Sequence, residues 1–333
     1  MDFKALKTTE NRFSSITSKE ARAIDELNDS LMWGAMTHLR ENGFRWLEVP
    51  LMTKITGACE NVDTLYAVDH FGVEAYLAQT GQLYLEAKIP VHEKVWTVIT
   101  SSRAEGSVDG RHLNQFQLVE FEHQGDFRMM LGNIEGTVKA MIREALEQNP
   151  GLLKELSRYD ELAKWVDQPF GEITYTQAVE AVRGTEHELE WGEDLTSKVE
   201  AELVKMNGNK PLFITHFPLA IKFFNMRQNP DEPEVVNSAD LIMPYSGESV
   251  GSAERENNYE NLVTRLVESP MFKTLARRGK TLEDFGDYLE IVKAFPVLHA
   301  GCGIGFNRIS QAVLGEDDIR VSSNYPLQRN VLY

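Results

Sequence analysis

The stretch from Ser101 to Glu122, SSRAEGSVDGRHLNQFQLVEFE, decides how the rest of the chain is interpreted. Its first charged pair, Arg103 and Glu105, stands two residues apart, so on a strand both side chains would project from one face of the sheet. An arginine in that position can hold a phosphate or a carboxylate through two hydrogen bonds. The same pattern is typical of an exposed cross-strand ion pair, so the pair alone does not settle its role.

The residues after this pair add the features of a polyphosphate site. Residues 106–110, GSVDG, have the composition of a turn, and Arg111 and His112 behind it are placed to fold back over a phosphate tail. Phe116 offers a ring on which a base can stack, although a single phenylalanine is more often part of a core. The whole stretch therefore predicts an ATP site built on a sheet.

A second informative stretch, His299–Arg308, reads HAGCGIGFNR and alternates glycine with other residues before it ends in an arginine. By itself it is typical of a dinucleotide-binding loop or of an ordinary glycine-rich turn. A dinucleotide-binding unit would carry an acidic ribose partner about 20 residues further on, and none stands there. We therefore predict a glycine-rich turn between a strand and a helix, with Arg308 as a candidate ligand group.

Two acids and one more arginine complete the set of candidates. Asp240 and Glu248 lie on neighbouring strand-like segments, and two carboxylates with a triphosphate form a typical magnesium site. Arg255 stands in an otherwise acidic stretch. Taken singly, the acids are ordinary surface residues and the arginine is typical of a surface ion pair.

The helical and extended patterns predict one α+β domain over residues 1–333, with a mostly antiparallel sheet flanked by helices. Thr17–Glu20 has the form of a capping box that opens a helix ending at Gly43. Segments 116–122 and 127–131 flank a His-Gln-Gly turn, which predicts an antiparallel hairpin. Residues 134–206 are expected to form a helical insertion that covers the sheet. Further strands are expected at 73–80, 94–100, 212–215, 240–243 and 249–251, and helices at 82–89 and 257–275.

Composition limits the class of protein. The 333 residues include 51 acidic and 34 basic side chains, a formal charge of −17, and binding a nucleic-acid backbone needs clustered Lys and Arg. Cys59 and Cys302 are far apart and lack metal-binding neighbours, which argues against a disulfide framework or a zinc site. The N-terminus has no apolar signal core and no segment reaches membrane-spanning length. We expect a cytoplasmic protein with no membrane partner and no nucleic-acid partner.

Taken in order, these segments resemble the catalytic core of class II aminoacyl-tRNA synthetases. Residues from Phe44 through Pro50 resemble the family's motif 1, Ser101–Glu122 its motif 2, and His299–Arg308 its motif 3. Thr80–Ala87, TGQLYLEA, is similar to the string SGQLYLEA of asparaginyl-tRNA synthetases, and Gly247–Glu256 resembles a second string of that family. The set is specific for the aspartyl/asparaginyl branch.

The resemblance implies ATP and Mg²⁺ as cofactors and a role for each candidate. Arg103 and Arg308 would be the catalytic arginines, with Arg103 on the α-phosphate and Arg308 facing Phe116 across the adenine. Leu85 stands where aspartyl enzymes have a lysine, so the asparaginyl pocket is the closer match. Motif 1 implies a homodimer. The implied ATP contacts are Arg103, Glu105, Arg111, His112, Phe116 and Arg308; the implied amino-acid contacts are Glu60, Gln82, Glu120 and Arg255; the implied magnesium ligands are Asp240 and Glu248.

Synthetases of this branch carry an N-terminal β-barrel that reads the anticodon, and nothing before Thr17 matches one. The chain therefore looks like the asparagine synthetases related to asparaginyl-tRNA synthetase. We expect an AMP-forming ligase that adenylates the aspartate side chain and transfers it to ammonia. A tRNA-charging or tRNA-binding fragment stays open as an alternative. So does an enzyme for an aspartate or asparagine relative, including dehydration of a carboxamide to a nitrile, because Asn225 stands where the branch has a tyrosine.

Overall fold

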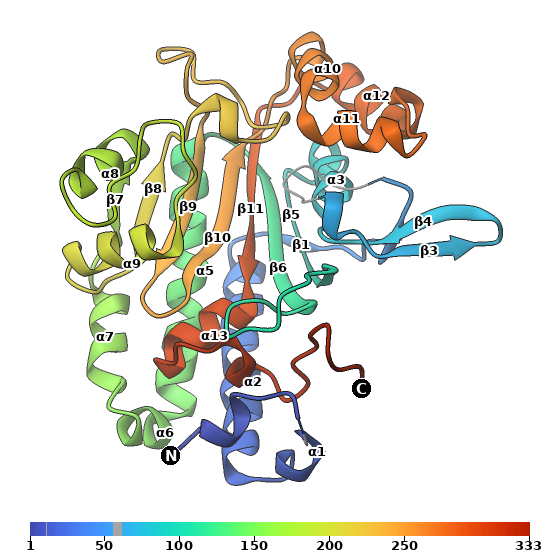
Figure 1. Ribbon diagram of the computed structural model, residues 1–333. Coiled ribbons are helices and arrows are strands. Elements are labelled where there is room, and N and C mark those ends of the chain that lie inside the picture. Colours follow the sequence, from blue (N-terminus) through green and yellow to red (C-terminus); the bar gives the residue numbers. More distant parts are fainter. Residues whose placement is uncertain (11, 56–61) are drawn as a thin grey trace.

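The computed structural model describes residues 1–10, 12–55 and 62–333, and its centre is an eight-stranded sheet (Figure 1). The strand order is β1-β5-β6-β11-β10-β9-β8-β7, and neighbours are antiparallel except for the parallel edge pairs β1–β5 and β7–β8. This confirms the predicted α+β class with a mostly antiparallel sheet. The strands are β1 (Arg45–Trp46), β5 (Lys94–Ser102), β6 (Gln115–Gln124), β7 (Gly171–Thr174), β8 (Leu212–Thr215), β9 (Ser238–Met243), β10 (Gly247–Glu254) and β11 (His299–Gly305).

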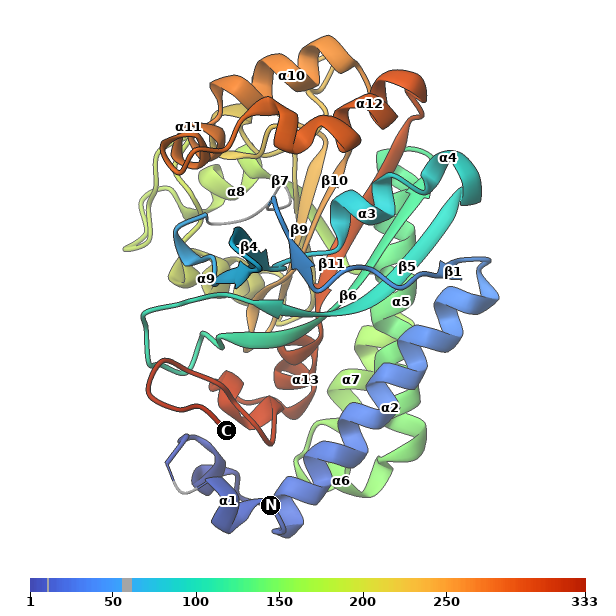
Figure 2. The same ribbon diagram turned by 90° about the vertical axis from the view of Figure 1, so that its right-hand side faces the viewer.

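Two long helices, α2 (Lys19–Glu41) and α5 (Phe127–Gln148), pack against each other on one face of this sheet (Figures 1 and 2). Their apolar sides meet every second residue of the strands, such as Val119 and Phe121 of β6, in the largest hydrophobic cluster. Gly34 lets the helices approach closely, because a Cβ there would overlap the backbone of α5. Since this face is filled, the opposite face of the sheet is the one that can hold a ligand.

The start of α5 corrects the predicted hairpin. β6 ends at Gln124, and the Asp126 side chain accepts a hydrogen bond of 2.9 Å from the backbone N–H of Met129, which caps a helix. The segment 127–131 is therefore the first turns of α5 and not a second strand. The apolar spacing that distinguishes a helix extends far beyond the five residues on which the hairpin prediction rested.

Residues 134–206 are mostly helical, as predicted, but they do not lie outside the core as a cover. The first part belongs to α5 and to the main hydrophobic cluster, and β7 extends the sheet beside β8. Helices α8 and α9 bury their apolar sides against β8 and β9 in a separate cluster. The segment is thus an integral part of the fold. Its helices after α5 are α6 (Pro150–Glu155), α7 (Tyr159–Asp167), α8 (Tyr175–Val182) and α9 (Ser197–Met206).

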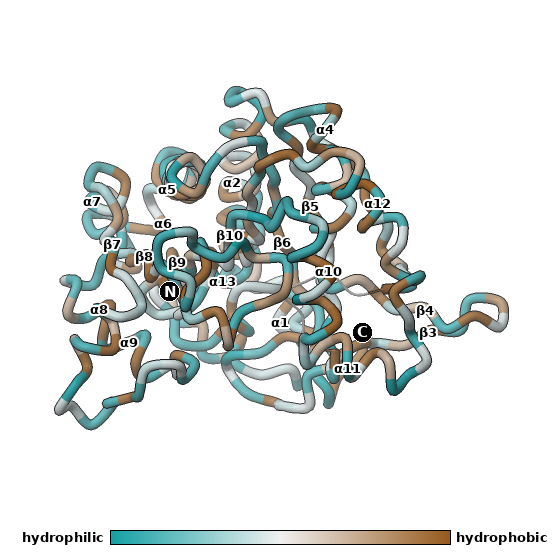
Figure 3. Tube along the Cα trace, turned by 90° about the horizontal axis from the view of Figure 1, so that it is seen from above, coloured by the Kyte–Doolittle hydropathy of each residue, from teal (hydrophilic) through white to brown (hydrophobic). Residues whose placement is uncertain are grey.

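A smaller layer borders the open face of the sheet. A three-stranded sheet of order β2-β4-β3 carries a hairpin that extends away from the rest of the molecule (Figures 1 and 3). The helix predicted over 257–275 is interrupted at Ser269, which is extended because the residue before a proline is disfavoured from the helical region. The elements are β2 (Met52–Thr53), β3 (Ala67–His70), β4 (Val73–Leu77), α3 (Gln82–Glu86), α4 (Ile89–His92), α10 (Tyr259–Glu268), α11 (Pro270–Arg277) and α12 (Gly286–Ala294).

The glycine run near the C-terminus is a strand and not the predicted turn. Gly301, Gly303 and Gly305 alternate along β11, and α13 (Phe306–Leu314) begins directly after it. A Cβ on Gly301 would overlap the carboxyl group of Glu122, so the glycine leaves space for an acid of the neighbouring strand.

The remaining α-helix is α1 (Arg12–Ser15), and both chain ends lie at one end of the molecule (Figures 1 and 2). Within the described ranges, no helix combines the length and apolar composition needed to span a membrane.

Candidate active site

A cavity of about 410 Å³ lies over the face of the sheet that α2 and α5 leave open. Strands β6, β9, β10 and β11 form its floor, and the connection between β5 and β6 forms one wall. The structure brings almost all of the predicted site residues into this one cavity. Those that line it are Gln82, Arg103, Glu105, Arg111, His112, Phe116, Glu120, Asp240, Glu248, Arg255 and Arg308; Glu60 lies outside the described residues.

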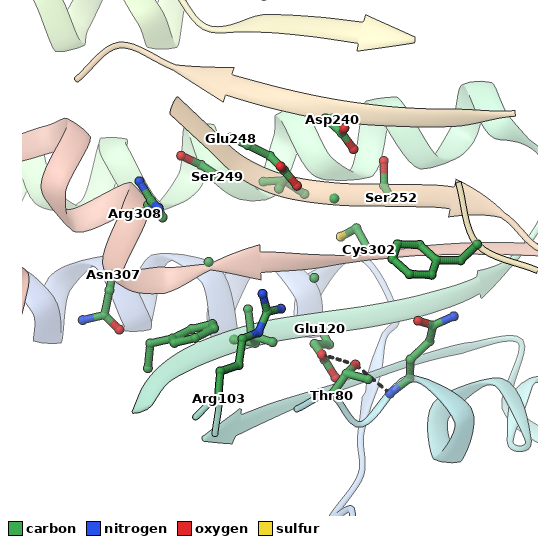
Figure 4. Close-up of a pocket in the computed structure, with 18 of the residues that line it drawn as sticks. Thr80, Arg103, Glu120, Asp240, Glu248, Ser249, Ser252, Cys302, Asn307 and Arg308 are labelled. Carbon is green, nitrogen blue, oxygen red and sulfur yellow. Dashed lines mark hydrogen bonds between the residues drawn. The ribbon is translucent and has the colours of Figure 1, made fainter. Parts of the chain in front are cut away.

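The two predicted metal ligands come together through an irregularity in β10. In the β9–β10 ladder, Asp240 pairs with Gly251 while Glu248 pairs with Ile242, so Ser249 is an extra residue. This β-bulge turns Glu248 to the same face as Asp240, whereas a regular ladder would direct it into the core. Figure 4 shows both acids on one side of β11, with Arg103, Thr80 and Glu120 on the other.

The electrostatics of these two acids fit a divalent cation. Desolvation by the surrounding protein and then the nearby charge of Asp240 raise the pKa of Glu248 to about 8, although its side chain also faces the open cavity, and burial raises the pKa of Asp240. A bound divalent cation would stabilise the ionised form of these two adjacent carboxylates, and Mg²⁺ prefers oxygen ligands of this kind. The described residues contain no group of three or more His, Cys, Asp and Glu suited to a metal, so the remaining ligands would come from phosphate and water.

Two further charged residues of this region were not predicted. Nζ of Lys222 lies 2.6 Å from Asp240; burial alone would lower its pKa, but Asp240 and Glu248 more than offset this and raise it. Glu200 of α9 is buried and accepts a hydrogen bond of 3.2 Å from the backbone N–H of Glu248. Nothing local in the sequence marks these two residues. We call Glu200, Asp240, Glu248 and Lys222 the acidic region.

Arg308, predicted to contact the adenine, lies beside the acidic region together with Arg111 and His112, which were predicted to contact the phosphates. Arg308, at the start of α13, donates to the backbone carbonyls of Ser246 at 2.5 Å and of Arg111 at 2.7 Å. His112 Nδ1 lies 3.0 Å from Asp109, whose carboxylate also accepts from the backbone N–H groups of Arg111 and His112. The loop that carries Arg111 and His112 is thus fixed in shape, while both side chains remain partly or fully exposed.

Arg103 and Glu105 line the cavity, but the predicted reason is wrong. β5 ends at Ser102, so the two side chains do not share a strand face and instead belong to the connection to β6. The guanidinium Cζ of Arg103 lies 5.3 Å from the centre of the Phe116 ring. Its Nε is buried and has no hydrogen-bond partner within the part of the chain that the structure describes. A buried donor of this kind is available for an anionic ligand.

At the other side of the cavity, polar groups are held by one another. Glu120 accepts from the hydroxyl of Thr80 at 2.5 Å (Figure 4). It also accepts from the backbone N–H of Gly81 at 2.7 Å, which fixes the start of α3. Gln82 donates to Glu86 at 2.6 Å. Sequence reasoning missed Glu86, although it lies inside the TGQLYLEA string that pointed to this site.

Glu86 is the centre of a buried charged network. Arg255 Nη2 lies 2.5 Å from Glu122 and its Nε lies 3.8 Å from Glu86, while His299 Nε2 lies 3.2 Å from Glu86. Glu86 also accepts from the hydroxyl of Tyr288 at 2.9 Å. Burial alone would raise the pKa of Glu86, but the hydrogen bond from His299 and the charge of Arg255 offset this and lower it. We call Glu86, Glu122, Arg255 and His299 the balanced region.

The family model of class II tRNA synthetases (D, K and N) matches residues 5–329. The chain belongs to this family. The asparagine–tRNA ligase of Thermococcus kodakarensis is 34% identical over 326 residues, which cover 97% of this chain and 73% of the relative. The asparagine–tRNA ligase of Thermococcus gammatolerans is 32% identical over 324 residues, with coverage of 97% and 73%.

Solved structures of class II synthetases agree with this assignment. The asparaginyl-tRNA synthetase of Pyrococcus horikoshii complexed with asparaginyl-adenylate superposes with a TM-score of 0.87 at 31% identity, covering 98% of this chain and 73% of that one. The aspartyl-tRNA synthetase of Entamoeba histolytica shares the fold, with a TM-score of 0.78, 24% identity and coverage of 97% and 62%. Class II synthetases use ATP and Mg²⁺, which meets the cofactor prediction. The expectation of no nucleic-acid partner gains no support from relatives that are named as tRNA ligases.

Proposed function

We propose that this class II synthetase activates the α-carboxylate of asparagine with ATP and passes the asparaginyl group to tRNA. The observation that carries the proposal is the charge balance of the balanced region. Two acids, Glu86 and Glu122, face two bases, Arg255 and His299. The two acids outweigh burial and raise the pKa of His299. Burial raises the pKa of Glu122 to about 7, and the guanidinium of Arg255 at 2.5 Å opposes this shift.

A closed balance of charge selects for a neutral side chain. A substrate carboxylate would add an uncompensated charge in a region where all four side chains are at most 5% exposed. A carboxamide adds no charge and presents both donors and an acceptor. The pocket therefore supports asparagine over aspartate as the amino acid, as does the asparaginyl-adenylate bound by the Pyrococcus horikoshii relative.

The chemistry needs two displacements. An oxygen of the substrate carboxylate attacks the α-phosphorus of ATP, and the bond from that phosphorus to the bridging oxygen breaks, which releases pyrophosphate. A hydroxyl of the acceptor RNA then attacks the carbonyl carbon, and AMP leaves. Arg103, with its buried unpartnered Nε, is placed to stabilise charge on the α-phosphate. Asp240 and Glu248 would hold Mg²⁺, which neutralises charge on the phosphates.

The choice of acceptor separates this proposal from the ammonia-dependent ligase expected from the sequence. None of the relatives described above is named for transfer to ammonia, and those relatives are named for ligation to tRNA. The tRNA alternative is therefore better supported. Ammonia transfer from an activated aspartate stays an outcome that the same experiment can detect.

Pyrophosphate exchange tests the first step. We expect exchange that depends on asparagine and Mg²⁺, with aspartate at least tenfold less effective, since leaving buried groups mismatched costs roughly 1–3 kcal/mol. The substitution Arg103→Met should lower the rate of pyrophosphate exchange about 10²–10³-fold. The control is Arg128→Met, because this exposed arginine pairs with Glu172 outside the cavity and should leave the rate unchanged.

A single-turnover experiment then tests the acceptor. Enzyme loaded with labelled asparagine and ATP is mixed with tRNA or with ammonium, and labelled RNA is measured beside free amide product. Formation of asparaginyl-tRNA supports the proposal. Exchange that prefers aspartate, followed by AMP-dependent release of asparagine only when ammonium is present, would overturn it in favour of the ammonia ligase.

A further inference from the structure

The C-terminal segment holds the loop that carries Arg111 and His112. The backbone carbonyls of four consecutive residues, 109 to 112, accept hydrogen bonds from outside the loop, and every donor lies between residues 308 and 328. The donors are Gln328 Nε2 to Asp109 at 2.6 Å, Ile319 N to Gly110 at 2.7 Å, Arg308 Nη2 to Arg111 at 2.7 Å, and Gln328 Nε2 to His112 at 2.7 Å. Figures 1 and 2 show the C-terminal tail beside the connection between β5 and β6.

Gln328 makes two of these four contacts with a single amide nitrogen. The side chain is 2% exposed, and its two N–H bonds bridge the carbonyls of Asp109 and His112, the two ends of the tight turn. Its Oε1 has no hydrogen-bond partner in the described ranges, so the amide acts in this structure through its donors alone. The neighbouring Leu327 accepts from the backbone N–H of Asn114 at 2.8 Å and closes the contact.

We infer that Gln328 is a positioning residue for the triphosphate of ATP, acting through Arg111 and His112. With the four carbonyls held by the C-terminal segment, the loop turns its exposed arginine and half-exposed histidine outward into the cavity. Both side chains are long or rotatable, and a fixed backbone lowers the entropy lost when they bind phosphate. This inference rests on the proposed function, because it requires the cavity to bind ATP.

The two ends of the nucleotide are proposed to contact different residues. Arg111 and His112 are proposed to meet the β- and γ-phosphates, whereas Phe116 and Arg308 are proposed to meet the adenine. Loss of the Gln328 contacts should therefore weaken the binding of a nucleoside triphosphate more than the binding of a nucleoside monophosphate. If Gln328 only stabilised the tail, its loss would weaken the binding of both ligands equally or of neither.

The experiment measures the affinity of the full chain for ATP with Mg²⁺ and for AMP by titration calorimetry. Gln328→Met keeps the volume and removes both donors, and we expect ATP to bind about tenfold more weakly while AMP changes less than about twofold. The matched control is Asn330→Ala, in the same tail, where the exposed amide donates to Thr9 at 3.2 Å and not to the loop. This variant should leave both affinities unchanged.

If Gln328→Met does not fold, Gln328→Asn is used, since it keeps an amide but is one methylene too short to bridge both carbonyls. A variant of Gln328 that binds ATP as tightly as the wild type, or that loses ATP and AMP affinity to the same extent, overturns the inference. Wild-type protein that binds neither nucleotide overturns the proposed function instead, so the two failures are distinguishable.

Discussion

The acidic region lines the cavity and the balanced region borders it through Glu122 and Arg255, but the charges of the two regions are compensated in opposite ways. In the balanced region, two acids and two bases satisfy one another at short range, and all four side chains are buried. In the acidic region, three carboxylates share one lysine, and Glu248 faces the open cavity. The charges of the balanced region compensate one another without a charged ligand. The acidic region has more carboxylates than its lysine can pair with, so a bound cation would stabilise it. Each region therefore suits a different part of a substrate.

The largest effect on stability is expected in the balanced region. Glu86→Gln would leave Arg255 and His299 without their shared anion in the interior, which costs about 3 kcal/mol of unfolding free energy at pH 7. The lowered pKa of Glu86 means that its stabilisation is present above the unfolded pKa of 4.5 and is lost as the pH falls through the folded pKa. Urea unfolding at pH 7 and at pH 4 should therefore show a difference between variant and wild type that shrinks in acid.

A surface acid provides the control for that comparison. Glu26 forms an exposed pair with Arg22 along α2, and Glu26→Gln should change the unfolding free energy by less than about 0.5 kcal/mol. Equal effects of the two glutamine variants would show that the balanced region is not a closed charge network.

Gly301 lies beside Glu122 of the balanced region, and Gly251 lies beside Glu248 and Asp240 of the acidic region. A Cβ on Gly301 would overlap the carboxyl of Glu122 and the backbone carbonyl of Phe121, so Gly301→Ala should cost about 2 kcal/mol and displace Glu122 from Arg255. A Cβ on Gly251 would meet Glu248 Oε1 at 3.5 Å and Asp240 Oδ1 at 3.9 Å, which are ordinary contacts. Thermal unfolding should separate the two variants clearly. Similar melting temperatures would mean that space is equally free in both regions.

The smallest effect is expected in the acidic region, and its sign is reversed. Because the folded pKa of Glu248 is raised to about 8, ionisation of this one group costs stability in the metal-free protein as the pH rises from its unfolded pKa of 4.5 to about 8, and the cost is absent below pH 4.5. Glu248→Gln should therefore stabilise metal-free protein at pH 8, by up to about 1 kcal/mol because solvent in the cavity screens the repulsion, and should be neutral near pH 5. Scanning calorimetry in a chelator measures this. A destabilised variant at pH 8 would refute the picture of repelling carboxylates.

The sequence was sufficient where a pattern is local or has a family counterpart. The apolar spacing from Ile24 to Leu39 predicted α2, and the strand at 212–215 was predicted with its observed bounds. The order of the motifs along the chain was enough to identify candidates that lie together in one cavity, although no single residue identified the site. Arg255 and Glu120, which were predicted to bind the amino acid, line the cavity and are hydrogen-bonded to other side chains of the protein.

What the sequence did not show depends on long-range geometry. Lys222 and Glu200 reach the acidic region from segments without a recognisable motif, and only the packing of α9 against β9 and β10 brings Glu200 there. Gln328 is one amide in a polar tail until the fold places it under the loop at 109–112. The mistaken hairpin at 116–131 failed for the opposite reason: a five-residue window fits both a strand and the first turns of α5.

Ser249, the extra residue in β10, changes which positions of the strand face the cavity. In an uninterrupted antiparallel ladder, positions on one side of the sheet keep a fixed parity, and Glu248 would fall on the side occupied by α2 and α5. Ser249 reverses that parity over a single step. A search that required both acids to obey the alternation of a regular strand would discard this chain, and a one-residue deletion beside Ser249 would transfer a negative charge from the ligand side of the sheet to its hydrocarbon side.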